Sequence, residues 1–105
     1  MDEFNIPFAQ MPWQESGPGV RTKTLIQGDR KLRIVEFSPE FIEPDWCVKG
    51  HSGYVLSGDM EIEFAHHGIR RFRTGEALLI PDGEGSRHRH YRSLETTILF
   101  LVEDC

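Results

Sequence analysis

Two short segments of the chain carry residues of the kinds that bind metal ions. Asp45 and Cys47 stand two positions apart in the first segment, and His51 follows them after a turn. His88 and His90 stand two positions apart in the second segment. Side chains two positions apart on a β-strand point to the same face, so pairing of the segments would bring carboxylate, thiolate and imidazole groups together. Such a mixture of oxygen, sulfur and nitrogen donors is what a borderline transition metal binds.

Short extended stretches separated by turn residues must position these side chains. The stretches lie at 20–26, 32–37, 45–49, 54–56, 60–64, 69–73, 77–80, 87–92 and 96–102. Turn signals recur about every 8–12 residues and no helical period is sustained, which is typical of an all-β barrel or sandwich. We therefore expect an all-β domain of eight or more strands with little helix.

Alternation of apolar and charged residues predicts which side chains face outward. Met60, Ile62 and Phe64 alternate with Glu61 and Glu63, the pattern of a half-buried strand. The two carboxylates should therefore lie on the outer face, away from a site inside the barrel.

The remaining histidines sort by similar rules. His88 and His90 should point into the barrel, with Arg87 and Arg89 pointing outward. The histidines at 66–67 precede a glycine in a pattern typical of a hairpin tip, so we expect them on the surface.

The order of these motifs resembles that of the cupin superfamily, small β-barrels of the jelly-roll type. The first cupin motif is His-x-His, three or four residues, Glu, six residues, Gly. Counting back seven positions from Gly58 gives His51 at the position of the family's Glu. Cys47 and Asp45 then take the positions of the second and first His. The spacing matches, although all three residue types differ.

The second cupin motif is matched in part. Gly75, Pro81 and Gly83 fit its Gly-x5-Pro-x-Gly portion, whereas His88 comes two positions late and His90 four. The resemblance covers residues 32–102. The segment Trp-Cys-Val-Lys-Gly-His-Ser-Gly-Tyr-Val-Leu is similar to a group of small single-domain cupins with an Asp/His-Cys-Trp motif, for which the resemblance supplies no reaction.

The resemblance implies that the first-motif residues point into the barrel. A buried Asp, Cys and His would cost several kcal/mol unless paired or bound to a metal. Cys47 and His51 are therefore expected ligands, joined by His88, with His90 as an alternative ligand or a supporting partner. Asp45 is either a further ligand or an edge carboxylate that faces solvent. The opposing interpretation is a barrel without metal, in which His51 is hydrogen-bonded and Cys47 is inert.

Two classes of function fit this site. In the first, a divalent transition metal (zinc, iron or nickel) acts on a small molecule in an enzyme of the cupin type. The alternative is a non-catalytic small-ligand or metal-binding module that senses occupancy and reports it to a partner. No general acid or base stands out once the ligands are assigned, although Tyr54 or Tyr91 could serve, so the sequence does not decide whether the protein is an enzyme.

Composition limits the other classes of function. The chain has 105 residues and a formal net charge of −5, which argues against binding to nucleic acid. It has no apolar run of about 20 residues and no signal-peptide pattern, so we expect a cytoplasmic protein that does not interact with membranes. Two cysteines make no disulfide framework, and Cys105 is expected to be a free thiol at the chain end.

The chain divides into an arm at 1–19 and a cupin domain at 20–105. The arm combines large apolar residues with prolines and glycines, so we expect it to pack on the barrel wall or on a second subunit. A homodimer is expected, because the arm and a flat sheet face offer more apolar surface than a small barrel can cover alone. Phe4, Phe8 and Trp13 are the residues predicted at or near that contact.

Overall fold

The structure, a computed structural model, describes residues 4–104 of the chain. Cys105, the predicted free thiol, lies outside the described residues. The described strands are β1 (Gln14–Gly17), β2 (Val20–Gln27), β3 (Arg30–Phe37), β4 (His51–Phe64), β5 (Gly68–Arg73), β6 (Ala77–Ile80) and β7 (His88–Asp104). Two 3₁₀ turns, η1 (Phe8–Gln10) and η2 (Glu84–Ser86), complete the elements. No described helix is long and apolar enough to cross a membrane.

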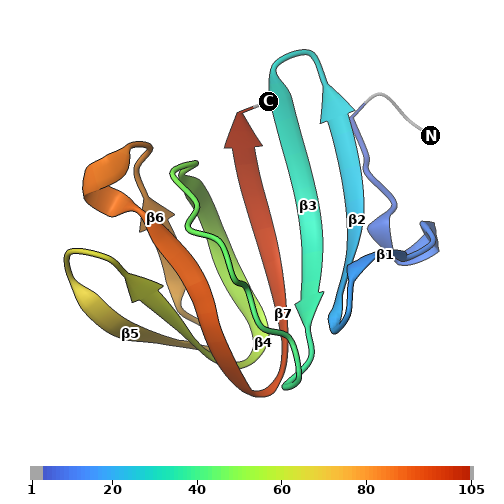
Figure 1. The fold of residues 1–105 in the computed structure, drawn as a ribbon. Coiled ribbons are helices and arrows are strands. Elements are labelled where there is room, and N and C mark those ends of the chain that lie inside the picture. Colours follow the sequence, from blue (N-terminus) through green and yellow to red (C-terminus); the bar gives the residue numbers. More distant parts are fainter. Residues whose placement is uncertain (1–3, 105) are drawn as a thin grey trace.

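The strands form one curled antiparallel sheet (Figure 1). Their order is β1-β2-β3-β7-β4-β5, and β6 pairs with the beginning of β4. β4 and β7 pair along nearly their whole lengths. On its other edge, the first part of β4 pairs with β6 and its last part pairs with β5. These two long strands connect the two walls of the barrel. The predicted all-β barrel is confirmed.

Gly58 forms the corner at which β4 bends. Its φ angle is +119°, a conformation that residues with a Cβ rarely adopt. A Cβ at this position would also lie 2.5 Å from the Cα of Thr97 on β7. Register shifts between Val55 and Met60 place irregularities around the same point, and such bulges bend a strand while it remains paired. Only glycine suits this corner.

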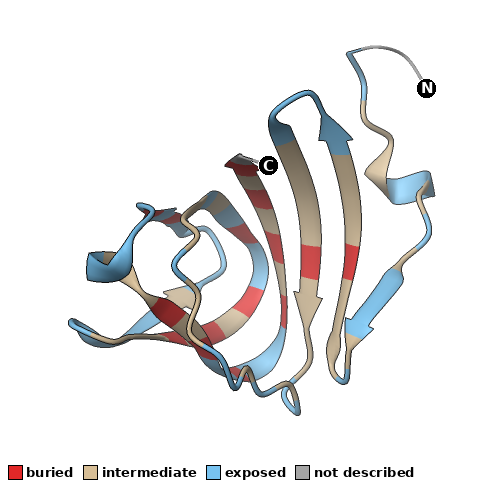
Figure 2. Ribbon diagram, turned by 45° about the horizontal axis from the view of Figure 1, so that its top comes forward, coloured by how far each residue is buried: buried red, intermediate tan, exposed pale blue. Residues whose placement is uncertain are grey.

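Alternating apolar residues meet inside the barrel, and Figure 2 shows the buried positions as bands along the strands. The buried core consists of Val35, Val55, Met60, Ile62, Leu78, Ile80, Leu99 and Leu101. On the opposite face of β4, Glu61 pairs with Arg92, and Glu63 accepts a hydrogen bond at 3.0 Å from Nε of Arg89. The predicted outward placement of both glutamates is therefore confirmed.

The expected number of strands was wrong, since the described residues form seven. The stretches at 54–56 and 60–64 join into β4, and those at 87–92 and 96–102 join into β7. The stretch at 45–49 is not a strand and makes only one isolated bridge. Turn residues inside β4 bend it without ending it, because bulges preserve pairing across the bend.

The described part of the N-terminal arm packs on its own barrel. Part of the arm is a strand, since β1 pairs with β2 at the edge of the sheet. The ring of Phe8 meets Phe100 edge-on at 6.3 Å, and the Phe8 carbonyl accepts a hydrogen bond from Nζ of Lys23 at 2.7 Å. Lys23 and Arg21 also cover the ring of Trp13. Within the described residues, Phe8 and Trp13 therefore contact side chains of the chain's own barrel.

Candidate metal centre

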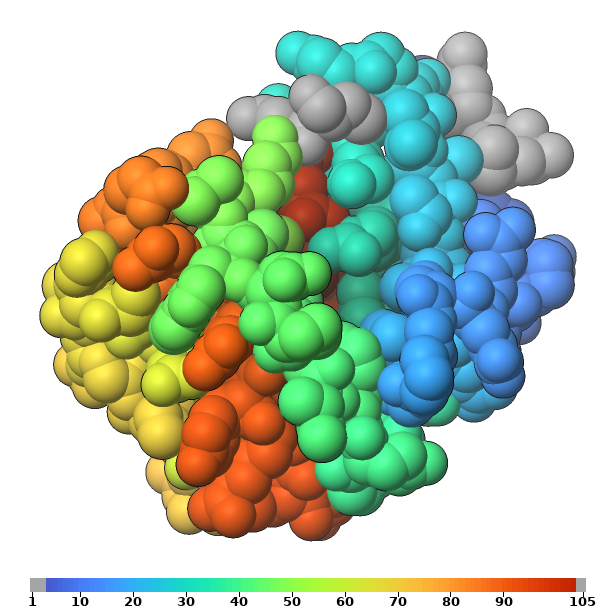
Figure 3. All heavy atoms as spheres, in the orientation of Figure 1, coloured from blue at the N-terminus to red at the C-terminus, as the bar shows by residue number. Residues whose placement is uncertain are grey.

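Three side chains that bind metals converge inside the barrel. One donor atom each from Cys47, His51 and His88 lies within 4.8 Å of the others. His51 opens β4 and His88 opens β7, whereas Cys47 comes from the connecting segment 38–50. Figure 3 shows part of this segment, in green, across the first residues of β7, in orange. The structure thus brings together three of the five predicted site residues.

The bridge between Cys47 and His88 sets their relative positions. The N–H of Cys47 donates to the carbonyl of His88 at 2.7 Å, and the N–H of His88 donates back at 3.0 Å. This two-way pairing places the two side chains opposite each other. The Cys47 thiol is half-buried, with Sγ 3.6 Å from the Lys49 carbonyl oxygen.

His88 has the arrangement of an imidazole ready to bind a metal. It is 4% exposed, and its Nδ1 lies 2.9 Å from the carbonyl oxygen of Ser86. A carbonyl only accepts hydrogen bonds, so Nδ1 carries the proton and Nε2 presents a lone pair. This Nε2 is buried without a hydrogen-bond partner. Burial lowers the pKa of His88, against the opposing effect of the Ser86 carbonyl, so the imidazole remains neutral near pH 7.

His51 is oriented by a buried carboxylate. Its Nδ1 lies 2.5 Å from Oε2 of Glu103, whose side chain is only 2% exposed. Arg33 donates to the same carboxylate through Nε at 2.5 Å and Nη2 at 3.1 Å. Burial alone would raise the pKa of Glu103, but the hydrogen bonds from His51 and Arg33 outweigh it and hold the pKa at about 2. A carboxylate at Nδ1 leaves Nε2 of His51 free for a metal.

These donors fit a divalent transition metal. Each imidazole has one nitrogen fixed by an oxygen acceptor, which is the usual support for a metal-bound histidine. A thiol and two imidazoles are the ligand types of zinc, and three protein ligands leave a coordination position open. The Nε2 of His88 is buried without a hydrogen-bond partner among the described residues, so its lone pair is available to a metal between the three side chains.

The other two predicted ligands lie apart from this cluster. His90 points inward as expected, but its ring stacks on Phe37 at 4.2 Å and its Nε2 lies 3.1 Å from the Ser93 hydroxyl. Burial lowers the pKa of His90 to about 4. Asp45 is exposed and does not join the group. Of the two inward histidines, His88 is the one that meets Cys47 and His51.

A cavity of about 320 Å³ opens beside the cluster. This volume falls in the range of about 300–1,000 Å³ that is usual for small-molecule sites. Apolar side chains make up most of the wall, namely Val20, Val35, Phe37, Phe41, Met60, Ile62, Leu78, Leu99 and Leu101. The polar lining residues are Ser16, Thr22, Arg33, Glu43, Cys47, His51, His88 and His90. A metal in the cluster would therefore face a mainly apolar space.

Several proteins of known structure share this architecture. KdgF from Halomonas sp. aligns over 91% of this chain and 89% of its own, with a TM-score of 0.75 and 20% identity. An RmlC-like cupin from Shewanella frigidimarina aligns over 99% and 91%, with a TM-score of 0.74 and 13% identity. The polyketide cyclase RemF from Streptomyces resistomycificus aligns over 96% and 78%, with a TM-score of 0.76 and 25% identity. The chain has a cupin fold.

The predicted cupin-type jelly roll is thereby confirmed. No protein-family model and no curated protein matches the sequence. Membership of the narrower group with the Asp/His-Cys-Trp motif therefore stays a prediction.

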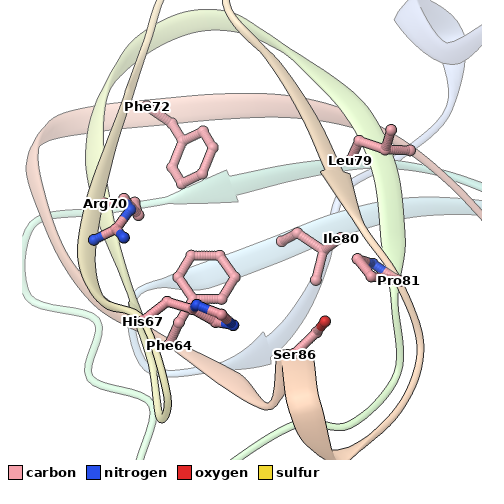
Figure 4. A pocket seen from close by; sticks show the side chains of 8 residues that line it. All are labelled: Phe64, His67, Arg70, Phe72, Leu79, Ile80, Pro81 and Ser86. Atoms are coloured by element: carbon pink, nitrogen blue, oxygen red, sulfur yellow. The ribbon is translucent and has the colours of Figure 1, made fainter.

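The cupin barrel has a second hollow of about 260 Å³ between β5, β6 and η2 (Figure 4). Its lining residues are Phe64, His67, Arg70, Phe72, Leu79, Ile80, Pro81 and Ser86. Neither a thiol nor a carboxylate is among them. The Nε2 of His67 lies 3.2 Å from the carbonyl oxygen of Gly85, and the lining offers no second histidine. This hollow lacks the donors of a metal centre.

Glu103 and Arg33 were missed in the sequence, although a signal for Glu103 was present. Leu99 and Leu101 are buried, and Glu103 continues the same period of two into the barrel. A charged residue at an inward position is costly without a partner, so the period alone pointed to a buried ionic site. Its partners, Arg33 and His51, come from other strands and could not be named without the register.

Proposed function

We propose that this cupin binds a divalent transition metal through Cys47 Sγ, His51 Nε2 and His88 Nε2. The observation that carries the proposal is the buried, unpartnered Nε2 of His88 beside a thiol and a second imidazole. Two imidazoles and a thiolate suit zinc, with iron and nickel as the other metals to test. When bound, the metal would supply Lewis-acid chemistry at the open coordination position.

The protein residues would hold and orient this centre. Glu103 keeps the proton of His51 on Nδ1, and the Ser86 carbonyl does the same for His88, so both rings present Nε2 to one point. Arg33 balances the charge of Glu103 and fixes the direction of its carboxylate. The apolar wall limits water around a small molecule in the cavity, which strengthens polar interactions at the centre.

We further propose that the centre acts on a small organic molecule. The cavity beside the cluster supports this, as does the similarity to RemF, which is named as a polyketide cyclase. A non-catalytic sensing module with the same metal site is the competing function. Turnover of candidate molecules by metal-loaded protein, absent from metal-free protein, would distinguish the two.

Metal analysis of protein purified without an affinity tag tests the binding proposal. We expect close to one transition metal ion per chain, and a Cys47→Ser, His51→Ala double variant should lose it. His66→Ala removes an exposed imidazole and serves as the control that should keep the metal. Unchanged metal content in the double variant would rule out this site.

We also propose a homodimer, now through the sheet and not through the arm. β4 and β6 are paired, and they expose Tyr54, Leu56 and Leu79, the last at 85%. A two-fold contact would cover this face in both subunits. Light scattering should report twice the chain mass at a protein concentration of tens of micromolar. The Leu79→Glu variant should have a lower mass. If removal of residues 1–14 abolishes the dimer, the contact is made by the arm and not by the sheet.

A further inference from the structure

Glu43 places a carboxylate at the wall of the metal cavity. It lies in the segment 38–50 and is half-buried among the lining residues. Its Oε1 accepts the backbone N–H of His90 at 2.7 Å, which holds the side chain on the first part of β7. Cys47, His51 and His88 line the same cavity, so the carboxylate and the cluster border one space.

No cation among the described residues forms an ion pair with Glu43. Among the described residues, Arg33 and Glu43 are the only lining side chains of the Lys, Arg, Asp or Glu types. Arg33 is held by the carboxylate of Glu103 through two hydrogen bonds, so its charge is already compensated. Glu43 takes part in none of the ion pairs between described residues, which are Arg21–Glu36, Arg33–Glu103, His51–Glu103, Arg71–Asp59, Arg73–Glu76, Arg87–Glu84, Arg89–Glu63 and Arg92–Glu61.

A metal in the cluster would complete the charge balance. A divalent ion brings two positive charges, and the Cys47 thiolate and Glu43 each bring one negative charge, so the three cancel. An uncharged ligand preserves this balance. A carboxylate ligand would add a negative charge near Glu43 in surroundings of low dielectric, where repulsion between like charges is strong. It would also offer Glu43 no hydrogen-bond donor.

We propose that Glu43 is a specificity-determining residue and that the cavity takes a small, uncharged molecule with an apolar body. The molecule would carry an oxygen for the metal and a hydroxyl or amide N–H group for the free oxygen of Glu43. The apolar wall accepts the body, and Glu43 discriminates against anions of the same shape. This inference rests on the proposed metal site.

Benzamide and benzoate test the proposal, because they have nearly the same shape and differ in charge and in the N–H donor. Their dissociation constants are measured by calorimetry at pH 7 on zinc-loaded protein. In Glu43→Gln the ratio of benzoate affinity to benzamide affinity should rise at least tenfold. The amide oxygen of glutamine can still accept the His90 N–H, so the variant should fold and take up zinc like the wild type.

Glu40→Gln is the matched control. Glu40 lies in the same segment, is exposed, and is absent from the lining of the metal cavity. Glu40→Gln removes the same charge as Glu43→Gln, so an effect of net charge alone would appear in both variants. We expect the benzoate-to-benzamide ratio to change less than twofold in Glu40→Gln.

Separate outcomes overturn the inference and the metal site. If Glu43→Gln takes up zinc normally and its ratio equals that of the wild type, or of Glu40→Gln, the selective role of Glu43 is wrong. Failure of both probes to bind the zinc-loaded wild type at millimolar concentration also overturns it. A loss of zinc in Glu43→Gln as large as in His51→Ala would make Glu43 a ligand instead. If the wild type takes up no metal, the proposed function fails, and this inference fails with it.

Discussion

His88 and His90 point into the same barrel from the same strand, but they have different surroundings. Both are buried, at 4% and 6% exposure. His88 has one nitrogen on a carbonyl, and its other nitrogen is unpartnered beside Cys47 and His51. His90 is stacked on Phe37 and meets a hydroxyl. Burial alone therefore does not identify a metal-binding histidine; the free lone pair and the nearby donors do.

The sharpest test of this difference replaces each histidine by phenylalanine. We expect His88→Phe to lower cobalt(II) affinity by more than about 100-fold, beyond the range for residues that only support a ligand. His90→Phe retains an aromatic ring against Phe37 and should change the affinity by less than about threefold, because His90 supplies no donor atom to the cluster. Absorbance titration with cobalt(II) measures both. Equal losses in the two variants would contradict the distinction.

The next largest effect should come from Glu103, which supports the cluster from behind His51. Glu103→Gln replaces the charged acceptor of the His51 proton with a neutral one, and we expect cobalt(II) affinity to fall about 10–100-fold. The cobalt absorption bands should also shift, since the orientation of His51 changes.

Glu36→Gln is the control for loss of a cross-strand ion pair. Glu36 accepts from Arg21 at 2.7 and 3.1 Å, much as Glu103 accepts from Arg33, but it touches no histidine. It should leave cobalt affinity and spectrum unchanged. An equal fall in both variants would mean that Glu103 acts through general stability and not through His51.

Without metal, we expect the loss of His90 to destabilise the fold more than the loss of His88, which is the reverse of their order in metal affinity. His90→Ala removes a stacked ring and leaves the Ser93 hydroxyl without its partner, so we expect a loss of about 1–3 kcal/mol in unfolding free energy. His88→Ala loses the hydrogen bond from Nδ1 to the Ser86 carbonyl but also removes a buried Nε2 that had no partner, and should cost about 1 kcal/mol less than His90→Ala. Urea unfolding in the presence of a chelator measures both. A greater loss for His88→Ala would show that its ring supports the fold more than the site.

The smallest effect should come from Ser93→Ala. Its hydroxyl lies 3.1 Å from Nε2 of His90 in a buried position, so the variant should lose about 0.5–1.5 kcal/mol of unfolding free energy. Metal affinity should not change, because the hydroxyl contacts His90, which is not part of the metal-binding cluster. A change in cobalt affinity would indicate that His90 is coupled to the metal centre.

Much of the candidate site was accessible from residue types and spacing. Cys47 and His51 were expected to meet His88 or His90 from the resemblance to the cupin motifs, and the structure brings Cys47, His51 and His88 together. The inward direction of both 88 and 90 followed from the period of two. Asp45 was not excluded by this reasoning, because its exposure depends on the path of a segment that forms no strand.

Glu43 and Glu103 show where that reasoning ended. Glu43 reaches the cavity because the segment 38–50 runs beside β7, where the N–H of His90 holds its carboxylate. Glu103 matters because strand pairing sets it near Arg33 and His51, which are distant in sequence. Neither relation is a property of local sequence.

The sequence by itself determined the all-β class and the inward and outward faces of the strands. These depend on the two-residue period of a strand. Tertiary structure alone decided which inward histidine meets Cys47, since the bridge between Cys47 and His88 depends on register. Register along β4 and β7 is shifted by irregularities between 55 and 62, and a period of two carries no information about such shifts. The two-residue alternation predicts which way a side chain points, whereas only the pairing of the strands determines how far along the barrel the side chain lies.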